Sequence, residues 1–216
     1  MSSKISCDAH MHTDFSTDCE SSVRSMLNAA VEKGLSAVCI TDHMDLDFPP
    51  QEGEGQAQDA PLFQFDVEEY FRVLTPLKEE YRGRLDVRIG IEIGLQPHLG
   101  AQYKKLLAAY PFDIVIGSIH LVRGLDPYYG KLFEGRPDAD TYREAFEETL
   151  TCIEQNEDFD TLGHLDYVVR YGKRKAEEYS YKAFADEIDA VLKKLISMGK
   201  GLEVNTGGLK YGLGFT

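Results

Sequence analysis

Five of the six histidines follow short β-type runs, which places their imidazoles at strand ends. His10 and His12 stand two residues apart. Because a strand repeats every two residues, both imidazoles face the same side and lie close enough to bind one metal ion. The other candidate ligands at or near strand ends are His43, Glu92, His120 and His164, with Asp42 beside His43 and Asp166 two residues after His164.

The combination of these residues is more informative than any one of them. Taken singly, each is equally well explained as a polar side chain that is hydrogen-bonded to a loop backbone. Five histidines and a glutamate converging at one edge without a metal would leave many poorly satisfied polar groups in a confined space. A divalent metal removes this conflict, and imidazole with carboxylate suits Zn, Mn or Fe better than Mg or Ca. The sixth histidine, His98, follows Pro97 at an expected helix start, and we expect it at the surface.

The elements that must position these residues are short strands that alternate with segments of helical period. This alternation predicts an α/β fold of βα units around a parallel sheet. Ligands of such folds bind at the carboxyl edge of the strands, where the loops converge. We expect six strands, near residues 5–10, 37–41, 87–93, 114–118, 161–164 and 201–205.

Three helices carry clear sequence signals. The best defined covers residues 181–198, with Ser180 as N-cap and Gly199 as the stop. Another covers residues 140–155 and has one apolar face. The first crossover helix has apolar residues at helical spacing and a glycine of the type that favours a helix C-cap; these residues are Val23, Met26, Leu27, Ala30, Val31 and Gly34.

Two segments are too polar and turn-rich for regular structure. They cover residues 48–64 and 124–137, and each follows an expected strand. Long loops at that edge of an α/β fold commonly contribute to active sites, so we expect both to border the site.

The composition is that of a single globular domain. The chain has 216 residues, against a prior of roughly 150 residues per domain, and 43% apolar with 28% charged residues is ordinary for a folded protein. A net charge of −14 repels nucleic-acid phosphates, and no basic cluster offsets it. No apolar run approaches the roughly 20 residues of a membrane helix, and the start carries no signal-peptide core. We therefore expect a cytoplasmic protein that binds neither nucleic acid nor membrane.

The cysteines indicate neither a zinc ribbon nor a thioredoxin-type redox motif, because no two of them form a CxxC pair. In a reducing compartment we expect all of them to be small buried residues. They are Cys7, Cys19, Cys39 and Cys152.

Several segments resemble motifs of the PHP (polymerase and histidinol phosphatase) superfamily, and most closely its histidinol-phosphatase branch. They occur in order across nearly the whole chain, which makes the resemblance far more specific than any single motif. The matching segments are Asp8-Ala9-His10-Met11-His12-Thr13 with Asp18, Ile40-Thr41-Asp42-His43, Gly90-Ile91-Glu92, Gly117-Ser118-Ile119-His120, Gly163-His164-Leu165-Asp166 and Glu203-Val204-Asn205-Thr206.

By this resemblance, the fold is a distorted (βα)7 TIM-like barrel that holds up to three divalent metal ions at its carboxyl mouth. Two basic residues, Arg170 and Lys210, occupy positions that look equivalent to the family's phosphate-binding groups. A lysine in place of the more usual arginine keeps the charge but loses the bidentate fork. The implied metal ligands are His10, His12 and Glu92 for the first ion, Glu92, His120 and His164 for the second, and Asp18 with His43 for the third.

The chain departs from the family's pattern at its end. The family's barrel closes with a further helix and strand carrying a Gly-Ser-Asp-Ala-His type motif, whose Asp and His complete two of the metal sites. The sequence ends at Thr216 before such a motif. The expectation is therefore one PHP-type phosphoesterase domain over residues 1–216 that is incomplete at its C-terminus and has two unpaired sheet edges.

The resemblance implies a metal-dependent histidinol-phosphatase of histidine biosynthesis, which acts on a small phosphorylated substrate. The expected mechanism is direct attack of a metal-bridging hydroxide on phosphorus, with Arg170 and Lys210 stabilising the equatorial charge. Asp42 and Asp166 are expected to cap loops or to orient the ligating histidines. Two alternatives stay open: a PHP phosphoesterase that acts on nucleotides or other small phosphate esters, and a metal-binding remnant that no longer turns over.

Overall fold

The computed structural model describes residues 5–50 and 63–213. The chain divides into two compact units, each built from segments that are distant in the sequence. Unit 1 comprises Met1–Ile93 and Tyr110–Ile116, and unit 2 comprises Gly94–Ala109 and Gly117–Thr216. Among the described residues, no helix is long and apolar enough to cross a membrane.

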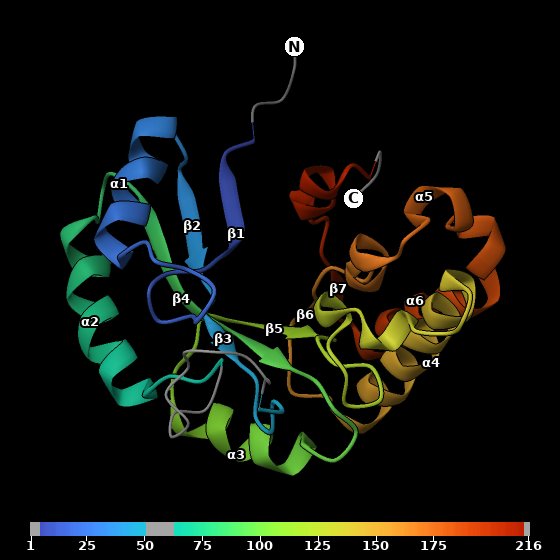
Figure 1. Ribbon diagram of the computed structural model, residues 1–216. Helices are drawn as coiled ribbons and strands as arrows, with labels where there is room; N and C mark the ends of the chain where they lie inside the picture. Colours follow the sequence, from blue (N-terminus) through green and yellow to red (C-terminus); the bar gives the residue numbers. More distant parts are fainter. Residues whose placement is uncertain (1–4, 51–62, 214–216) are drawn as a thin grey trace. The chain divides into compact units, whose positions relative to one another are not determined.

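Unit 1 is a parallel sheet whose strands are connected by helices. Its elements are β1 (Cys7–Met11), α1 (Val23–Lys33), β2 (Ala37–Ile40), β3 (His43–Met44), α2 (Val67–Glu80) and β4 (Asp86–Gly94), the last residue of which falls in unit 2. Strand β1 pairs in parallel with β2, β2 with β4, and the short β3 with β4. Figure 1 shows α1 and α2 along one side of these strands, which is the arrangement that βα units produce.

Local signals in the sequence set the ends of both helices in unit 1. Ser22 and Asp66 cap α1 and α2, because each side chain accepts a hydrogen bond from a backbone N–H of the first turn. Gly34 ends α1 in the left-handed conformation with φ of 73°. Helix α2 is tied to the sheet by Tyr70, which is fully buried and whose hydroxyl donates to the carbonyl oxygen of Ile40 at 3.1 Å. The end of β2, which Asp42 and His43 follow, is therefore held in place by α2.

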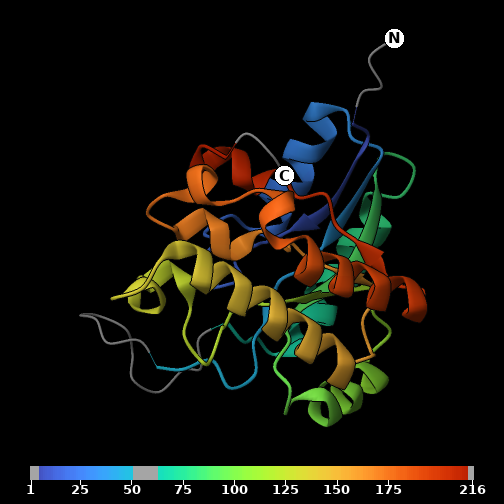
Figure 2. The ribbon, with the colours of Figure 1, turned by 90° about the vertical axis from the view of Figure 1, so that its right-hand side faces the viewer.

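Unit 2 contains two long helices that pack against each other. Its elements are α3 (Gly100–Ala109), the end of β5 (Ile114–Ser118), the 3-10 helices η1 (Pro127–Tyr129) and η2 (Lys131–Phe133), α4 (Asp138–Gln155), β6 (Thr161–Leu162), η3 (Tyr167–Tyr171), α5 (Lys175–Glu178), η4 (Tyr181–Phe184), α6 (Ala185–Met198), β7 (Gly201–Leu202) and η5 (Thr206–Tyr211). Figure 2 shows α4, in yellow to orange, beside α6, in orange to red. Phe146 of α4 and Ile188 of α6 belong to the same buried cluster. Strand β6 pairs in parallel with β7.

The parallel βα organisation expected from the sequence is confirmed, and each of the six expected strands is present. Strand β3 is additional, because two residues are too few to show a period. The segment 124–137 was expected to lack regular structure, and this is wrong: it forms η1 and η2, since Asp126 caps η1 by accepting a hydrogen bond from a backbone N–H. Of the other expected loop, 48–64, residues 51–62 lie outside the described part of the chain.

The cysteines follow the expectation only in part. Cys39 and Cys152 are buried, whereas Cys7 is exposed and Cys19 is partly exposed. Cys7 begins β1, which stands at the end of the strand order and, within the described part of the chain, pairs with β2 alone. Cys19 lies in the loop before α1, where its thiol donates to the carbonyl oxygen of His12 at 3.5 Å. Burial as small core residues is therefore wrong for these two.

Candidate metal centre

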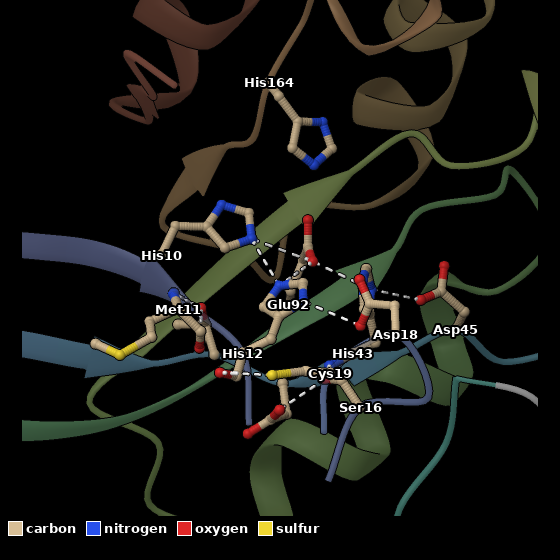
Figure 3. A network of polar contacts seen from close by, with 12 residues as sticks. His10, Met11, His12, Ser16, Asp18, Cys19, His43, Asp45, Glu92 and His164 are labelled. Carbon is tan, nitrogen blue, oxygen red and sulfur yellow. Dashed lines mark hydrogen bonds and ion pairs between the residues drawn. The ribbon is translucent and has the colours of Figure 1, made fainter. Parts of the chain in front are cut away.

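Glu92 of β4 is a buried carboxylate surrounded by three imidazoles, as Figure 3 shows. Its side chain is 0% exposed. Its Oε2 atom lies 3.2 Å from Nε2 of His10, 3.1 Å from Nε2 of His12 and 3.1 Å from Nδ1 of His43. The imidazoles come from β1, from the residue after β1 and from β3, so the strands of unit 1 converge on one oxygen atom.

His10 and His12 face the same side, as their spacing predicted. Their Nε2 atoms are 3.2 Å apart and their ring centroids 5.2 Å apart. The residue between them, Met11, is buried and bonded to Thr41 at the end of β2: its N–H donates to the hydroxyl at 3.1 Å, and its carbonyl accepts from the Thr41 N–H at 2.8 Å. The backbone between the two imidazoles is therefore fixed, and both rings project to one side.

Asp42 organises the loop that follows β1. Its carboxylate is fully buried and accepts hydrogen bonds from the N–H of Thr13 at 2.6 Å, the Thr13 hydroxyl at 2.8 Å and the Ser16 hydroxyl at 2.6 Å. The Ser16 hydroxyl in turn accepts from the backbone N–H of His43 at 3.0 Å. Asp42 therefore joins the segment after His12 to the strand that carries His43, which agrees with its expected role as a residue that caps a loop.

A second group of possible ligands adjoins the first. Asp18 lies with Oδ1 3.4 Å from Nδ1 of His12 and with Oδ2 3.7 Å from Nε2 of His43. On the other side of the His43 ring, Oδ2 of Asp45 lies 3.1 Å from Nδ1. Sequence reasoning did not identify Asp45; the available signal was its position two residues after His43, because alternate residues of an extended chain share a face.

The carboxylates of unit 1 raise the pKa of the neighbouring imidazoles. Burial by itself lowers the pKa of His12, but the hydrogen bonds that its ring donates to the carboxylates of Asp18 and Glu92 outweigh burial and raise that pKa to about 10. Burial also opposes the charged form of His43, whose pKa is nevertheless raised, first of all by the charge of Glu92. Burial raises the pKa of Asp18, yet hydrogen bonds from the two imidazoles lower it well below its usual range. The carboxylates of Asp18 and Glu92 therefore stabilise the protonated, positively charged form of the imidazoles. A divalent cation can replace the protons on these rings.

The donor atoms of His10, His12 and Glu92 fit one divalent metal ion. The two Nε2 atoms and Oε2 form a nearly equilateral triangle with sides of 3.2, 3.2 and 3.1 Å. Ligand atoms about 2.0–2.1 Å from a tetrahedral metal lie about 3.3 Å from one another. Hydrogen bonds alone do not explain the triangle, because three mutually close atoms cannot all be joined by near-linear bonds. Two imidazoles and a carboxylate suit Zn, Mn or Fe.

In unit 2, His120 and His164 follow β5 and β6, and both are buried. Their ring centroids are 5.4 Å apart. Each ring also contacts Tyr167, at 5.6 and 5.2 Å between centroids. The backbone N–H of His164 donates to Oε2 of Glu203 at 2.8 Å. Glu203 therefore positions the loop that carries His164, a role that sequence reasoning did not assign although Glu203 lies in one of the family-like motifs.

The two basic residues expected to meet phosphate occupy different environments. Arg170 is only 8% exposed, and its Nη2 donates to Oδ1 of Asn205 at 3.0 Å. The same nitrogen lies 3.7 Å from Oδ1 of Asp166, so Asp166 faces Arg170 and makes no side-chain cap to η3. Lys210 is exposed on η5. The structure thus holds Arg170 in a defined position and leaves Lys210 at the surface. His98 is exposed, as expected.

Relatives of this chain carry the name histidinol-phosphatase. The chain is 35% identical over 199 residues to the "Probable histidinol-phosphatase" of Clostridium acetobutylicum, an alignment that covers 92% of this chain and 72% of the relative. It is 28% identical over 200 residues to the histidinol-phosphatase of Lactococcus lactis subsp. lactis, covering 92% of this chain and 71% of the relative.

Solved structures share the fold. The histidinol phosphate phosphatase from Lactococcus lactis subsp. lactis, in complex with zinc, L-histidinol and phosphate, superposes with a TM-score of 0.84 at 28% identity and covers 93% of this chain and 73% of that chain. A structure from Listeria monocytogenes has a TM-score of 0.72 at 18% identity, covering 96% of this chain and 85% of that one. The model of the PHP domain matches residues 8–207, which include every candidate site residue except Lys210. This chain belongs to the PHP domain family.

Proposed function

We propose that this protein is a metal-dependent histidinol-phosphatase, which hydrolyses L-histidinol phosphate to L-histidinol and phosphate in histidine biosynthesis. The observation that carries the proposal is the triangle formed by His10, His12 and Glu92, whose donor atoms fit a divalent metal ion. The relatives that carry this name and the similar fold solved with zinc, L-histidinol and phosphate support the choice of substrate.

The proposal assigns ligands for up to three metal ions. In unit 1, the triangle would hold one ion, and Asp18 with His43 would hold another. In unit 2, His120 and His164 would contribute ligands to a further ion. Both units are assigned to one PHP-type phosphoesterase domain over residues 1–216, because the family match extends through residues of both.

Hydrolysis breaks the bond between phosphorus and the alcohol oxygen, and water supplies the oxygen that replaces it. A bound divalent metal ion lowers the pKa of water and polarises the phosphoryl oxygens. The negative charge of Glu92 offsets part of that ion's charge inside a buried site. Arg170, held by Asn205, presents a guanidinium group to the phosphate oxygens, where negative charge must be stabilised, and Lys210 is assigned as a second phosphate-binding cation. No covalent bond to the chain is formed, so no nucleophilic side chain is needed.

We also propose a small phosphate ester as the substrate and a cytoplasmic location. The net charge of −14 disfavours contact with a polynucleotide but not with a small anion that is drawn to bound cations and Arg170. The free thiols of Cys7, Cys19, Cys39 and Cys152 are typical of proteins in a reducing compartment.

The test is phosphate release by protein loaded with Zn or Mn, measured with L-histidinol phosphate beside a panel of nucleoside monophosphates, with metal content determined by elemental analysis. We expect L-histidinol phosphate to be the preferred ester. Glu92→Gln keeps the size of the side chain but removes its charge, so it should abolish both tight metal binding and turnover. Glu32→Gln, on the exposed surface of α1, is the matched control and should behave like the wild type. Bound metal without phosphate release from any ester would contradict the proposal.

A further inference from the structure

Five tyrosines of unit 2 form a continuous aromatic cluster, which we call the tyrosine cluster: Tyr128 and Tyr129 of η1, Tyr167 and Tyr171 of η3, and Tyr211 of η5. Tyr171 is at its centre. The ring centroids of Tyr167, Tyr128 and Tyr211 lie 5.1, 5.6 and 5.4 Å from that of Tyr171, and Tyr129 lies 5.1 Å from Tyr128. These contacts are edge-to-face, with interplanar angles between 69° and 87°, an arrangement that aromatic pairs favour.

The inner end of the tyrosine cluster adjoins the groups assigned to phosphate chemistry. The ring of Tyr167 contacts the rings of both His120 and His164. The guanidinium carbon of Arg170 lies 5.7 Å from the Tyr167 centroid. The inner end therefore presents positive charge to a ligand, which suits the phosphate.

The outer end of the tyrosine cluster is open to solvent. Tyr128 is 62% exposed, Tyr129 46% and Tyr211 36%. Large aromatic rings are costly to leave in water, and a contiguous exposed patch of them marks a binding surface more often than a single exposed ring does. A cation already lies at this end: the ammonium group of Lys175 is 5.8 Å from the Tyr211 centroid and donates to the Tyr211 carbonyl oxygen at 3.0 Å. Tyr128 and Tyr129 keep ring surface that a ligand can reach, and aromatic faces attract cations.

A buried carboxylate fixes the geometry of the cluster. Asp126 accepts hydrogen bonds from the backbone N–H of Tyr128 at 2.9 Å and from the Tyr167 hydroxyl at 3.1 Å. The inner and outer rings are thus tied to the same side chain, which is only 8% exposed. Such positioning lowers the entropy cost of binding a ligand.

We propose that the exposed faces of the tyrosine cluster bind the organic part of the substrate and select phosphate esters of alcohols that carry an ammonium group or a cationic imidazole. The inference rests on the proposed function and specifies its substrate class. The arrangement places the guanidinium group of Arg170 at one end of the cluster and exposed π faces at the other, so it complements a ligand that is anionic at one end and cationic at the other. A nucleobase also stacks on tyrosine, but it carries no positive charge and lacks the cation–π attraction.

The experiment compares the KM of L-histidinol phosphate with that of ethyl phosphate, which has neither amine nor ring, in metal-loaded protein. We expect Tyr128→Ala to raise the KM of L-histidinol phosphate about ten-fold, as loss of a desolvated cation–π contact would, and to leave the KM of ethyl phosphate and both kcat values within about two-fold. Tyr128→Phe keeps the ring and should restore the wild-type KM. Tyr181→Ala, at an exposed tyrosine outside the cluster, is the matched control.

A binding measurement separates this inference from the proposed function. Calorimetric titration with L-histidinol should show a Kd about ten-fold higher for Tyr128→Ala than for the wild type and for Tyr128→Phe. Equal changes of KM for both esters, no change in either, or a wild-type preference for a nucleoside monophosphate would overturn the inference. If the wild type hydrolysed no ester, the proposed function would fail, and the titration with L-histidinol would still decide whether the subsite exists.

Discussion

The carboxylate of Asp42 accepts two hydrogen bonds from Thr13, one from its backbone N–H at 2.6 Å and one from its hydroxyl at 2.8 Å. Thr13 directly follows His12, and Asp42 directly precedes His43. The pair therefore fixes the spacing between two imidazoles that both approach Glu92. A carboxylate that contacts none of these imidazoles thus holds His12 and His43 on either side of Glu92.

We expect Asp42→Ala to lower the free energy of unfolding by about 3 kcal/mol, because it leaves several buried donors without their charged acceptor. Thr13→Val removes only the hydroxyl contact and should cost about 1 kcal/mol. Urea denaturation followed by circular dichroism measures both. Asp14→Ala, at an exposed neighbour, is the control and should stay within about 0.5 kcal/mol of the wild type. Equal stability of Asp42→Ala and the wild type would show that the network does not hold the loop.

Asp45 lies 3.1 Å from Nδ1 of His43 and orients that ring. Replacement by asparagine keeps the shape of the side chain but removes its charge, so metal affinity should fall about 10- to 100-fold, as is typical when a partner of a ligating histidine is changed. Equilibrium dialysis with Zn measures this directly. An unchanged affinity would assign Asp45 a purely structural role.

Metal binding should release protons. The pKa of His12 is raised to about 10 and that of His43 is also raised, so below these values the metal-free protein holds protons that the ion must displace. Affinity should therefore increase as the pH rises from 6 toward the raised pKa values. Calorimetry at pH 7 in two buffers of different ionisation enthalpy gives the number of protons released, and heats that are independent of the buffer would contradict this expectation.

The same pKa values determine how the stability of the metal-free protein depends on pH. Because folding raises the pKa of His12 above its ordinary value near 6.5, the folded chain binds protons more tightly than the unfolded chain. The resulting stability is fully present below pH 6.5 and is lost as the pH rises toward about 10. Thermal denaturation of chelator-treated protein between pH 6 and 9 should show a falling midpoint. In His12→Gln this dependence should be weaker.

Gly207 leaves room for the pair formed by Arg170 and Asn205. A Cβ atom at this position would lie 2.7 Å from Oδ1 of Asn205 and 3.0 Å from Nη1 of Arg170, so Gly207→Ala must displace one of these side chains. We expect a KM for L-histidinol phosphate raised about ten-fold, which corresponds to about 1.4 kcal/mol of lost binding, with little change in stability because side-chain ends can move. Steady-state kinetics beside thermal denaturation checks both parts. A loss of stability with an unchanged KM would argue against a role for Arg170 in binding phosphate.

Local patterns in the sequence predicted the structural features that depend on a few neighbouring residues, such as the shared face of two side chains and the ends of helices. The two-residue spacing of His10 and His12 predicted that the imidazoles share a face, and their Nε2 atoms are 3.2 Å apart. Gly34 and Gly199 marked helix ends, and both adopt the left-handed conformation that glycine tolerates. Helix α2 was not anticipated, since Pro76 within it interrupts the usual helical signal.

The sequence by itself determined which residue types reach the carboxyl ends of the strands, because strand period and chain order are local properties. Only the tertiary structure decided how each of them is used. Arg170 and Lys210 were equivalent candidates in the sequence, yet Arg170 is buried beside Asn205 and Lys210 is exposed. The tyrosine cluster likewise depends on distant segments, because Tyr171 contacts Tyr128 and Tyr211. Burial and contact depend on which distant segments pack together, and no local pattern encodes that packing.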